Sequence, residues 1–220
     1  MKKIFLFIYI FFYSQQLISQ FKDAEQIIDA IRIKYDEIKD YTATIEAAVD
    51  MERIKVPKMD VKIYFKQPDK FHIESKNFAM IPREGVAINP AELLNKFNAK
   101  LLGIEQLNSR PVYKIQLTPK SEQKLISLES YVYIDQENLY IVKLASTPSE
   151  GRTIVINFSQ SLVQNKYYLP SKIFVKFDNA ETNSSQRLPR SGSVTISYKN
   201  YLLNTGLSDS LFTKKSNNLK

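Results

Sequence analysis

The side chains that could carry catalysis are few and scattered. The one histidine of the chain, His72, lies in an alternating run between Phe71 and Ile73, and the alternation places His72 and Glu74 on the solvent face of a strand. A His-x-Glu pair begins the zinc site of nucleobase deaminases, but that site is completed by cysteines. The chain contains no cysteine. Because other zinc sites need two or three His or Cys ligands, the sequence predicts no metal site.

Other catalytic arrangements have equally little support. A serine hydrolase with a nucleophile elbow needs a G-x-S-x-G motif and a histidine base, and the sequence has no such motif. The carboxylate pairs Glu46 with Asp50, and Asp60 with Glu74, lie on outward strand faces among lysines, where solvated charge explains them better than glycosidase chemistry. A serine and lysine dyad stays open, with no motif behind it. The five glycines never cluster into a phosphate-binding loop. We therefore predict that the protein is not an enzyme and uses no cofactor.

The N-terminus has the pattern of an export signal. A basic start is followed by ten apolar residues, Ile4 to Tyr13, and by a polar stretch that ends at Gln20. Ten residues are too few to cross a hydrocarbon core of about 30 Å as a helix. We expect residues 1–20 to be a signal peptide, residues 21–213 a single domain, and residues 214–220 a disordered basic tail.

Charge and cysteine usage narrow the partners and the compartment. The chain carries a formal net charge of +8, but its lysines and arginines are spread along the strands, which is not typical of a nucleic-acid groove. An exported chain without cysteine has no disulfides and depends on its apolar core for stability. We expect an exported protein that does not span the membrane and binds no nucleic acid.

The elements follow from hydrophobic periodicity. Apolar residues spaced by three and four predict an amphipathic helix over residues 24–40, and Asn89 with Pro90 predicts the start of a short second helix over residues 91–97. Almost everywhere else the period is two. The predicted strands lie at 41–51, 59–66, 71–73, 101–107, 112–118, 128–135, 140–145, 153–158, 172–178 and 194–198, with short extended pieces between residues 78 and 88. This pattern predicts an α+β fold in which a strongly curved antiparallel sheet of about eleven strands carries helices on one side.

One face of this sheet is the candidate functional feature. Strand alternation places large apolar residues on it, and the helices offer too few apolar partners to cover more than about half of that face. The predicted lining consists of Met59, Val61, Ile63, Phe65, Phe71, Ile73, Met80, Leu101, Tyr113, Ile115, Leu117, Tyr140, Val142, Ile154, Ile156 and Phe158. The predicted helical lid consists of Ile27, Ile28, Ile31, Leu93, Leu94 and Phe97. The face is either a self-packed core, as in small barrels, or a cavity that binds acyl chains, and periodicity alone does not decide.

The order of several segments resembles the LolA family of periplasmic lipoprotein carriers. After the amphipathic helix come the runs from Tyr41 to Thr44, Ile63 to Phe71, Leu102 to Glu105, Val112 to Pro119 and Tyr168 to Phe174. The resemblance implies an unclosed half-barrel of about eleven strands, with a helical lid over a hydrophobic cavity for lipid tails. In the family's carriers an Arg before the proline of the second run bonds to the lid and helps to gate the cavity. Here that position is Gln67, the candidate gate.

These observations favour a periplasmic carrier or chaperone. Its ligands would be the acyl chains of lipoproteins or of another envelope lipid, and a membrane-associated donor or acceptor protein would be its partner. The alternative is a periplasmic lipid-sensing regulator similar to the RseB and MucB proteins, which carry an additional C-terminal domain. A hydrolase of envelope lipids is a third hypothesis, and the sequence offers no nucleophile and base for it.

Overall fold

The computed structural model describes residues 21–51, 54–55, 59–74, 94, 97–120, 128–148, 152–179 and 191–213. The predicted signal peptide, the predicted basic tail, and the predicted extended pieces between residues 78 and 88 lie outside these residues. So do Met80 and Leu93, two of the predicted lining and lid residues. The side chain of Met59 is outside the description as well, although its backbone is in a strand.

Helix α1, Ala24–Asp36, is amphipathic as its sequence predicts. Asp23 caps it, and the Asp23 carboxylate accepts a hydrogen bond from the amide of Gln26 at 2.9 Å. Ile27 and Ile31 are fully buried on one face. The helix ends four residues earlier than predicted, because the chain turns at Ile38 to enter the first strand at Asp40.

Within the residues that the structure describes, eleven strands form one antiparallel sheet. The strands are β1 Asp40–Met51, β2 Ile54–Lys55, β3 Met59–Lys66, β4 Lys70–Glu74, β5 Phe97–Leu107, β6 Arg110–Pro119, β7 Leu128–Asp135, β8 Ile141–Pro148, β9 Arg152–Val163, β10 Tyr167–Asn179 and β11 Ser191–Leu203. Their order is β4-β3-β1-β11-β10-β9-β8-β7-β6-β5, and β2 pairs with β1. The sheet ends at β4 and β5, so it is an unclosed half-barrel, which confirms the predicted fold class.

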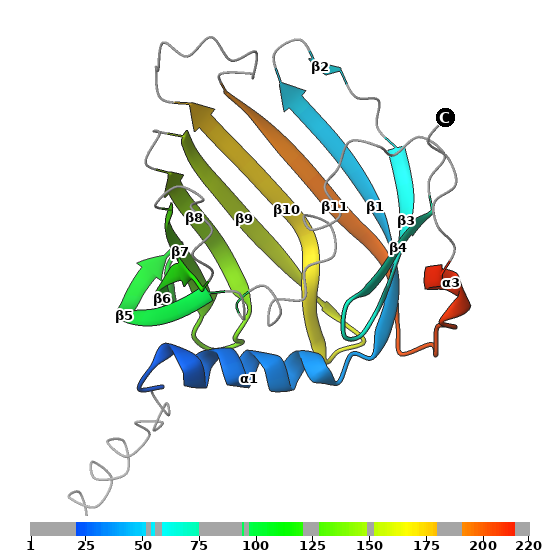
Figure 1. Cartoon of the computed structure of the whole chain (residues 1–220), viewed down its shortest axis with the longest axis horizontal. Helices are drawn as coiled ribbons and strands as arrows, with labels where there is room; N and C mark the ends of the chain where they lie inside the picture. Colours follow the sequence, from blue (N-terminus) through cyan, green and yellow to red (C-terminus); the bar gives the residue numbers. More distant parts are fainter. Residues whose placement is uncertain are drawn as a thin grey trace, which may run out of the picture.

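Figure 1 shows the shape that this order produces. The strands β5 to β7 curl round at one side of the sheet and β3 with β4 at the other, while α1 runs along one end of the strands. The short helix α3, Ser210–Thr213, packs beside β4. The main cluster of buried apolar side chains joins α1 to the strands, so the core lies where the helix meets the concave face.

The predicted second helix is partly wrong. Leu94 is helical and buried, but Phe97, placed in that helix from the sequence, is the first residue of β5. The ladder between β5 and β6 begins with Phe97 opposite Pro119 and continues without interruption to Leu101 opposite Ile115. Phe97, Ala99 and Leu101 alternate toward the core, and this pairing outweighs a short helical spacing.

Candidate functional site

The concave face is built from rows of apolar residues that run across neighbouring strands. In one of these rows, cross-strand pairing aligns Phe158, Ile173, Ile196 and Ala47, and all four are buried. We call this the sealed row. Its members come from β9, β10, β11 and β1, because alternation along each strand brings every second residue to the same face.

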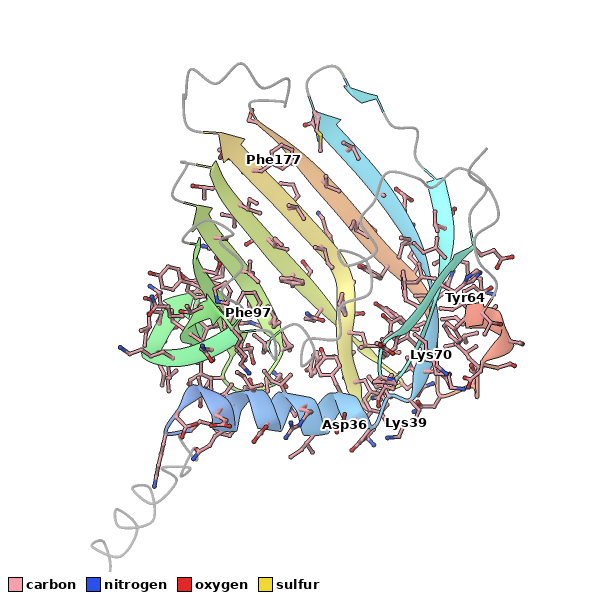
Figure 2. All side chains as sticks on the ribbon, viewed as in Figure 1. Asp36, Lys39, Tyr64, Lys70, Phe97 and Phe177 are labelled. Atoms are coloured by element: carbon pink, nitrogen blue, oxygen red, sulfur yellow. The ribbon has the colours of Figure 1, made fainter. Side chains whose placement is uncertain are left out.

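Two further rows lie beyond the sealed row, and we call them the open rows because their side chains are only partly buried. The first open row consists of Ile156, Val175, Val194 and Val49. The second, outermost open row consists of Ile154, Phe177, Gly192 and Met51. Figure 2 shows Phe177 on the sheet well away from α1. The apolar pattern therefore extends beyond the part of the sheet that is sealed.

Gly192 lies where the outermost open row leaves no space for a larger residue. A Cβ atom at this position would lie 2.7 Å from the ring carbon Cζ of Phe177 and 2.9 Å from Cγ of Met51. The side chains of Phe177 and Met51 therefore close over the glycine from both neighbouring strands. Beyond Ile154 the outermost open row continues to Ser146 on β8 and Ser130 on β7. These two serines are polar and buried, and their hydroxyls are hydrogen-bonded to each other at 3.0 Å.

Helix α1 covers the sealed part of the face. Ile27 and Ile31 belong to the core cluster, and Ile28 packs against it. Leu94 is also part of this cluster. Polar contact between α1 and the sheet's turns includes a hydrogen bond from Lys34 Nζ to the carbonyl of Asn138 at 2.9 Å. The helix is thus held mainly by non-directional apolar contact.

Gln67 is bonded to the end of α1. Its side-chain amide Nε2 donates to the carbonyl of Tyr35 at 3.0 Å and to the carbonyl of Ile38 at 2.8 Å. Tyr35 lies in the last turn of α1, and Ile38 lies just beyond the C-cap residue Glu37. The side chain that the sequence marks as the candidate gate therefore joins the β3–β4 turn to α1.

A cluster of tyrosines surrounds a small cavity next to Gln67. The cavity has a volume of about 20 Å³, and its lining consists of Tyr35, Ile38, Tyr41, Phe65, Gln67, Leu169, Pro170, Ile173, Tyr198 and Tyr201. The hydroxyl of Tyr201 donates to the carbonyl of Pro170 at 2.8 Å, and that of Tyr35 to the carbonyl of Tyr168 at 3.3 Å. This volume holds about one water molecule and no acyl chain. No local pattern in the sequence links these tyrosines, because they meet only in the folded sheet.

Burial sets the ionisation of this tyrosine cluster. It raises the pKa of Tyr35 well above its usual value near 10. It does the same for Tyr41, Tyr198 and Tyr201, and repulsion from neighbouring tyrosines adds to the effect. All four side chains are therefore neutral at physiological pH, and the cavity beside Gln67 carries no charge from them.

Most of the predicted lining lies in or against the main core cluster. Val61, Ile63, Tyr113, Ile115, Leu117 and Phe158 are members of that cluster, Phe71, Ile73, Leu101 and Ile156 pack against it, Phe65 is buried beside Tyr41, and Ile154 is in the outermost open row. The sequence reasoning identified Ile154 and Ile156 in the open rows. It did not include Val175, Val194 and Phe177 in the lining, although they follow the same alternation.

Val142 and Tyr140 are exceptions to the predicted lining. A β-bulge in the pairing of β7 with β8 makes Val142 an extra residue, with Ile141 opposite Ile134 and Lys143 opposite Tyr133. Ile141 therefore enters the core cluster in place of Val142. Tyr140 precedes β8, and its hydroxyl accepts a hydrogen bond from Arg110 Nη1 at 2.7 Å in a separate polar pocket.

The described residues contain few features that suggest other chemistry. Within them, no three His, Cys, Asp or Glu side chains gather closely enough to hold a metal ion. In the same part of the chain, no helix has the length and apolarity needed to span a membrane.

Comparison with known proteins identifies a matching family and solved structures with a similar architecture. A family model with the description "Uncharacterized protein" matches residues 88–217. No curated protein matches the chain. Among solved structures, a domain described as an outer membrane lipoprotein-sorting protein from Vibrio parahaemolyticus is similar, with a TM-score of 0.65 and 13% identity over 86% of this chain and 95% of that one.

Two other structures have the same arrangement. A DUF1329 family protein from Desulfovibrio piger gives a TM-score of 0.62 with 14% identity, covering 85% of this chain and 94% of the other. A LolA superfamily protein from Nitrosomonas europaea gives 0.55 with 14% identity, covering 85% and 97%. The chain belongs to the matched family and is a divergent LolA-like protein in its fold. These identities are low enough that the solved structures establish the fold alone.

The LolA-like fold explains how the elements of the site are placed. The sheet is unclosed, and within the part of the chain that the structure describes α1 covers the end of the concave face nearest to it. The arrangement offers apolar surface without positioned acids, bases or nucleophiles among the described lining residues. Chemically, this surface can bind apolar groups.

Proposed function

We propose that this protein is a periplasmic carrier that binds the acyl chains of lipoproteins, or of another envelope lipid, on its concave face beneath α1. The observation that supports the proposal is the continuation of apolar residues into the two open rows. A sheet that needed only a core for stability would carry polar residues on the part that the helix does not seal. Here Ile156, Val175 and Phe177 continue the apolar pattern.

Binding requires α1 to move away from the sheet. The tyrosine-lined cavity holds about 20 Å³, whereas pockets for ligands of drug size enclose roughly 300–1,000 Å³. In this proposal the structure is the closed state. Because apolar contacts hold α1 over the sealed row, the acyl chain of a ligand can replace them when the helix lifts. The movement breaks directional contacts as well, namely the bonds of Gln67 and those that Lys34 and Tyr35 donate.

The place of action follows from the N-terminal sequence. A basic, apolar and polar order over residues 1–20 would direct export, and an acyl-chain carrier in the periplasm needs a membrane-associated donor or acceptor. In this proposal residues 21–213 act as one lipid-binding domain. Mass spectrometry of lipids that co-purify with protein released by osmotic shock tests both points, since a carrier should bring acyl lipids with it. Protein that retains residues 1–20 in the membrane fraction, or that carries no lipid, argues against the proposal.

Replacing Ile156 with Asn should weaken acyl-chain binding. The change puts an amide into an open row, where a bound acyl chain would leave it without a hydrogen-bond partner, and we expect about a tenfold loss of affinity, equivalent to about 1.4 kcal/mol. The affinity for a fluorescent fatty acid measures this effect.

Val155→Asn is the matched control. Val155 is the next residue on β9 and is also partly buried, but it faces the opposite side of the sheet. The affinity of the Val155→Asn variant for the fatty acid should stay within about twofold of the wild-type affinity. If both variants bind the probe as the wild type does, the open rows are not the binding surface.

A further inference from the structure

A polar pocket of about 410 Å³ lies apart from the tyrosine-lined cavity. The pocket lies between four strands: the start of β6, the end of β7, and parts of β9 and β10. Its lining includes Arg110, Asp135, Glu137, Tyr140, Gln160 and Tyr168. Sequence reasoning did not find it, because these residues come from four strands and a turn. Its volume is large enough for a sugar-sized molecule.

Arg110 and Asp135 form one wall with fixed positions. The Asp135 carboxylate is buried, and its Oδ1 accepts from the amides of Glu137 at 3.1 Å and Asn138 at 2.7 Å. Arg110 Nη1 lies 3.8 Å from Asp135 Oδ2 and donates to the hydroxyl of Tyr140. The Arg110 side chain is 63% exposed, so its other N–H groups can reach a ligand.

Gln160 leaves an unused acceptor in this pocket. Its Nε2 donates to the carbonyl of Ile141 at 3.2 Å, which fixes the orientation of the amide. The other end, Oε1, is buried and has no hydrogen-bond partner within the part of the chain that the structure describes. A buried acceptor without a donor is unfavourable, and because this oxygen has almost no accessible surface, an O–H or N–H group of a ligand reaches it when the amide turns toward the pocket.

Two aromatic rings complete the pocket. The ring centroids of Tyr140 and Tyr168 lie 5.3 Å apart, with an angle of 40° between the planes. Burial raises the pKa of Tyr140, and the charge of Asp135 acts in the same direction, so this hydroxyl stays protonated and able to donate. Flat ring faces beside polar groups suit a molecule that has both C–H surfaces and hydroxyls.

From this combination we propose that the pocket binds a neutral, hydroxyl-rich ligand of the size of a sugar unit. Each hydroxyl both donates and accepts, so one ligand can satisfy Gln160 Oε1 and also accept from Arg110. The lining carries the carboxylates of Asp135 and Glu137, which repel a phosphate or another anion, while Lys34 Nζ on the carbonyl of Asn138 offsets part of that charge. An ammonium group would meet the charge of Arg110. A neutral polyol has neither conflict.

A ligand with this chemistry is either a free sugar or the sugar headgroup of a glycolipid. The second source rests on the proposed function, because its acyl chains would occupy the concave face while the headgroup occupies this pocket. The two sources differ in what a short glycoside does by itself. A free sugar should bind without an alkyl chain, whereas a headgroup should bind weakly alone and gain affinity when the chain is attached.

Calorimetric titration of the full mature chain tests the proposal. The probes are the methyl glycosides of glucose, galactose and mannose, the octyl glycosides of the same sugars below their micelle concentrations, and inorganic phosphate. We expect at least one methyl or octyl glycoside to bind saturably and phosphate not to bind. Gln160→Leu should weaken binding of the glycoside about tenfold, and Arg110→Gln, at an exposed side chain, should weaken it about as much.

Gln116→Leu is the matched control, because it makes the same chemical change on β6 outside the pocket. It should bind the glycoside as the wild type does. Binding of no glycoside, or equal affinity in the wild type and in both pocket variants, overturns the proposal. A fluorescent fatty acid titrated into the same samples separates this result from failure of the carrier proposal, since its binding depends on the open rows and not on Gln160.

Discussion

The free energy of unfolding should fall steeply as the pH rises above 10. The reason is the tyrosine cluster at the end of α1, which contains Tyr35, Tyr41, Tyr198 and Tyr201. Burial raises the pKa of each of them in the folded protein, and mutual repulsion raises the pKa values of Tyr41, Tyr198 and Tyr201 further. In the unfolded chain these tyrosines ionise near pH 10.

The sign of the effect follows from proton linkage. Below pH 10 all four tyrosines are protonated in both states, and their contribution to stability is fully present. Above pH 10 the unfolded chain loses protons that the folded chain retains, so each tyrosine lowers the free energy of unfolding by about 1.4 kcal/mol per pH unit. Four such groups give a decrease of roughly 5 kcal/mol per unit, which is comparable with the whole stability of many domains.

Urea unfolding at a series of pH values from 8 to 12 measures this slope. Tyr41→Phe keeps the ring that stacks on Phe65 at a centroid distance of 5.1 Å and removes one ionisable group. Its slope above pH 10 should be smaller than that of the wild type by about 1.4 kcal/mol per unit. A flat profile between pH 10 and 12 in the wild type would show that these tyrosines ionise freely in the folded state.

The fold could be predicted from the sequence because its signals are local. The period of two along each strand and the spacing of Ile27, Ile28 and Ile31 are set by neighbours in the chain, and the strands and α1 follow them closely. The pairing of β1 with β11 is different. It joins residues more than 140 positions apart, such as Val49 and Val194, and no local pattern encodes it.

The errors in the site have two physical causes. Bulges change which residues face the core, as at Val142, because one extra residue shifts the alternation of a strand by one position. Tertiary pairing also replaced the helical pattern at Phe97. The tyrosine cluster and the pocket at Gln160 could not be predicted, since each is assembled from residues on strands that meet only through the curvature of the sheet.

Replacing Gln67 with Leu should speed the uptake of an apolar probe by about thirtyfold. Leucine keeps the approximate volume but cannot donate to the carbonyls of Tyr35 and Ile38, which Gln67 Nε2 contacts at 3.0 and 2.8 Å. Two neutral hydrogen bonds contribute about 2 kcal/mol together. If opening of α1 precedes binding, the loss of about 2 kcal/mol increases the population of the open state by about thirtyfold.

Stopped-flow fluorescence with a fatty-acid probe measures the uptake rate, and Gln116→Leu again serves as the control, at a site away from α1. Gln67→Arg should act in the opposite direction, because a guanidinium donates charge-assisted bonds to the same carbonyls and stabilises the closed state. Equal rates in the wild type, Gln67→Leu and Gln67→Arg, with all three folded, would mean that the contact at the β3–β4 turn does not control α1. Opposite shifts in the two variants would instead assign control of uptake to the hydrogen bonds of this one side chain, because apolar packing over the sealed row is the same in all three proteins.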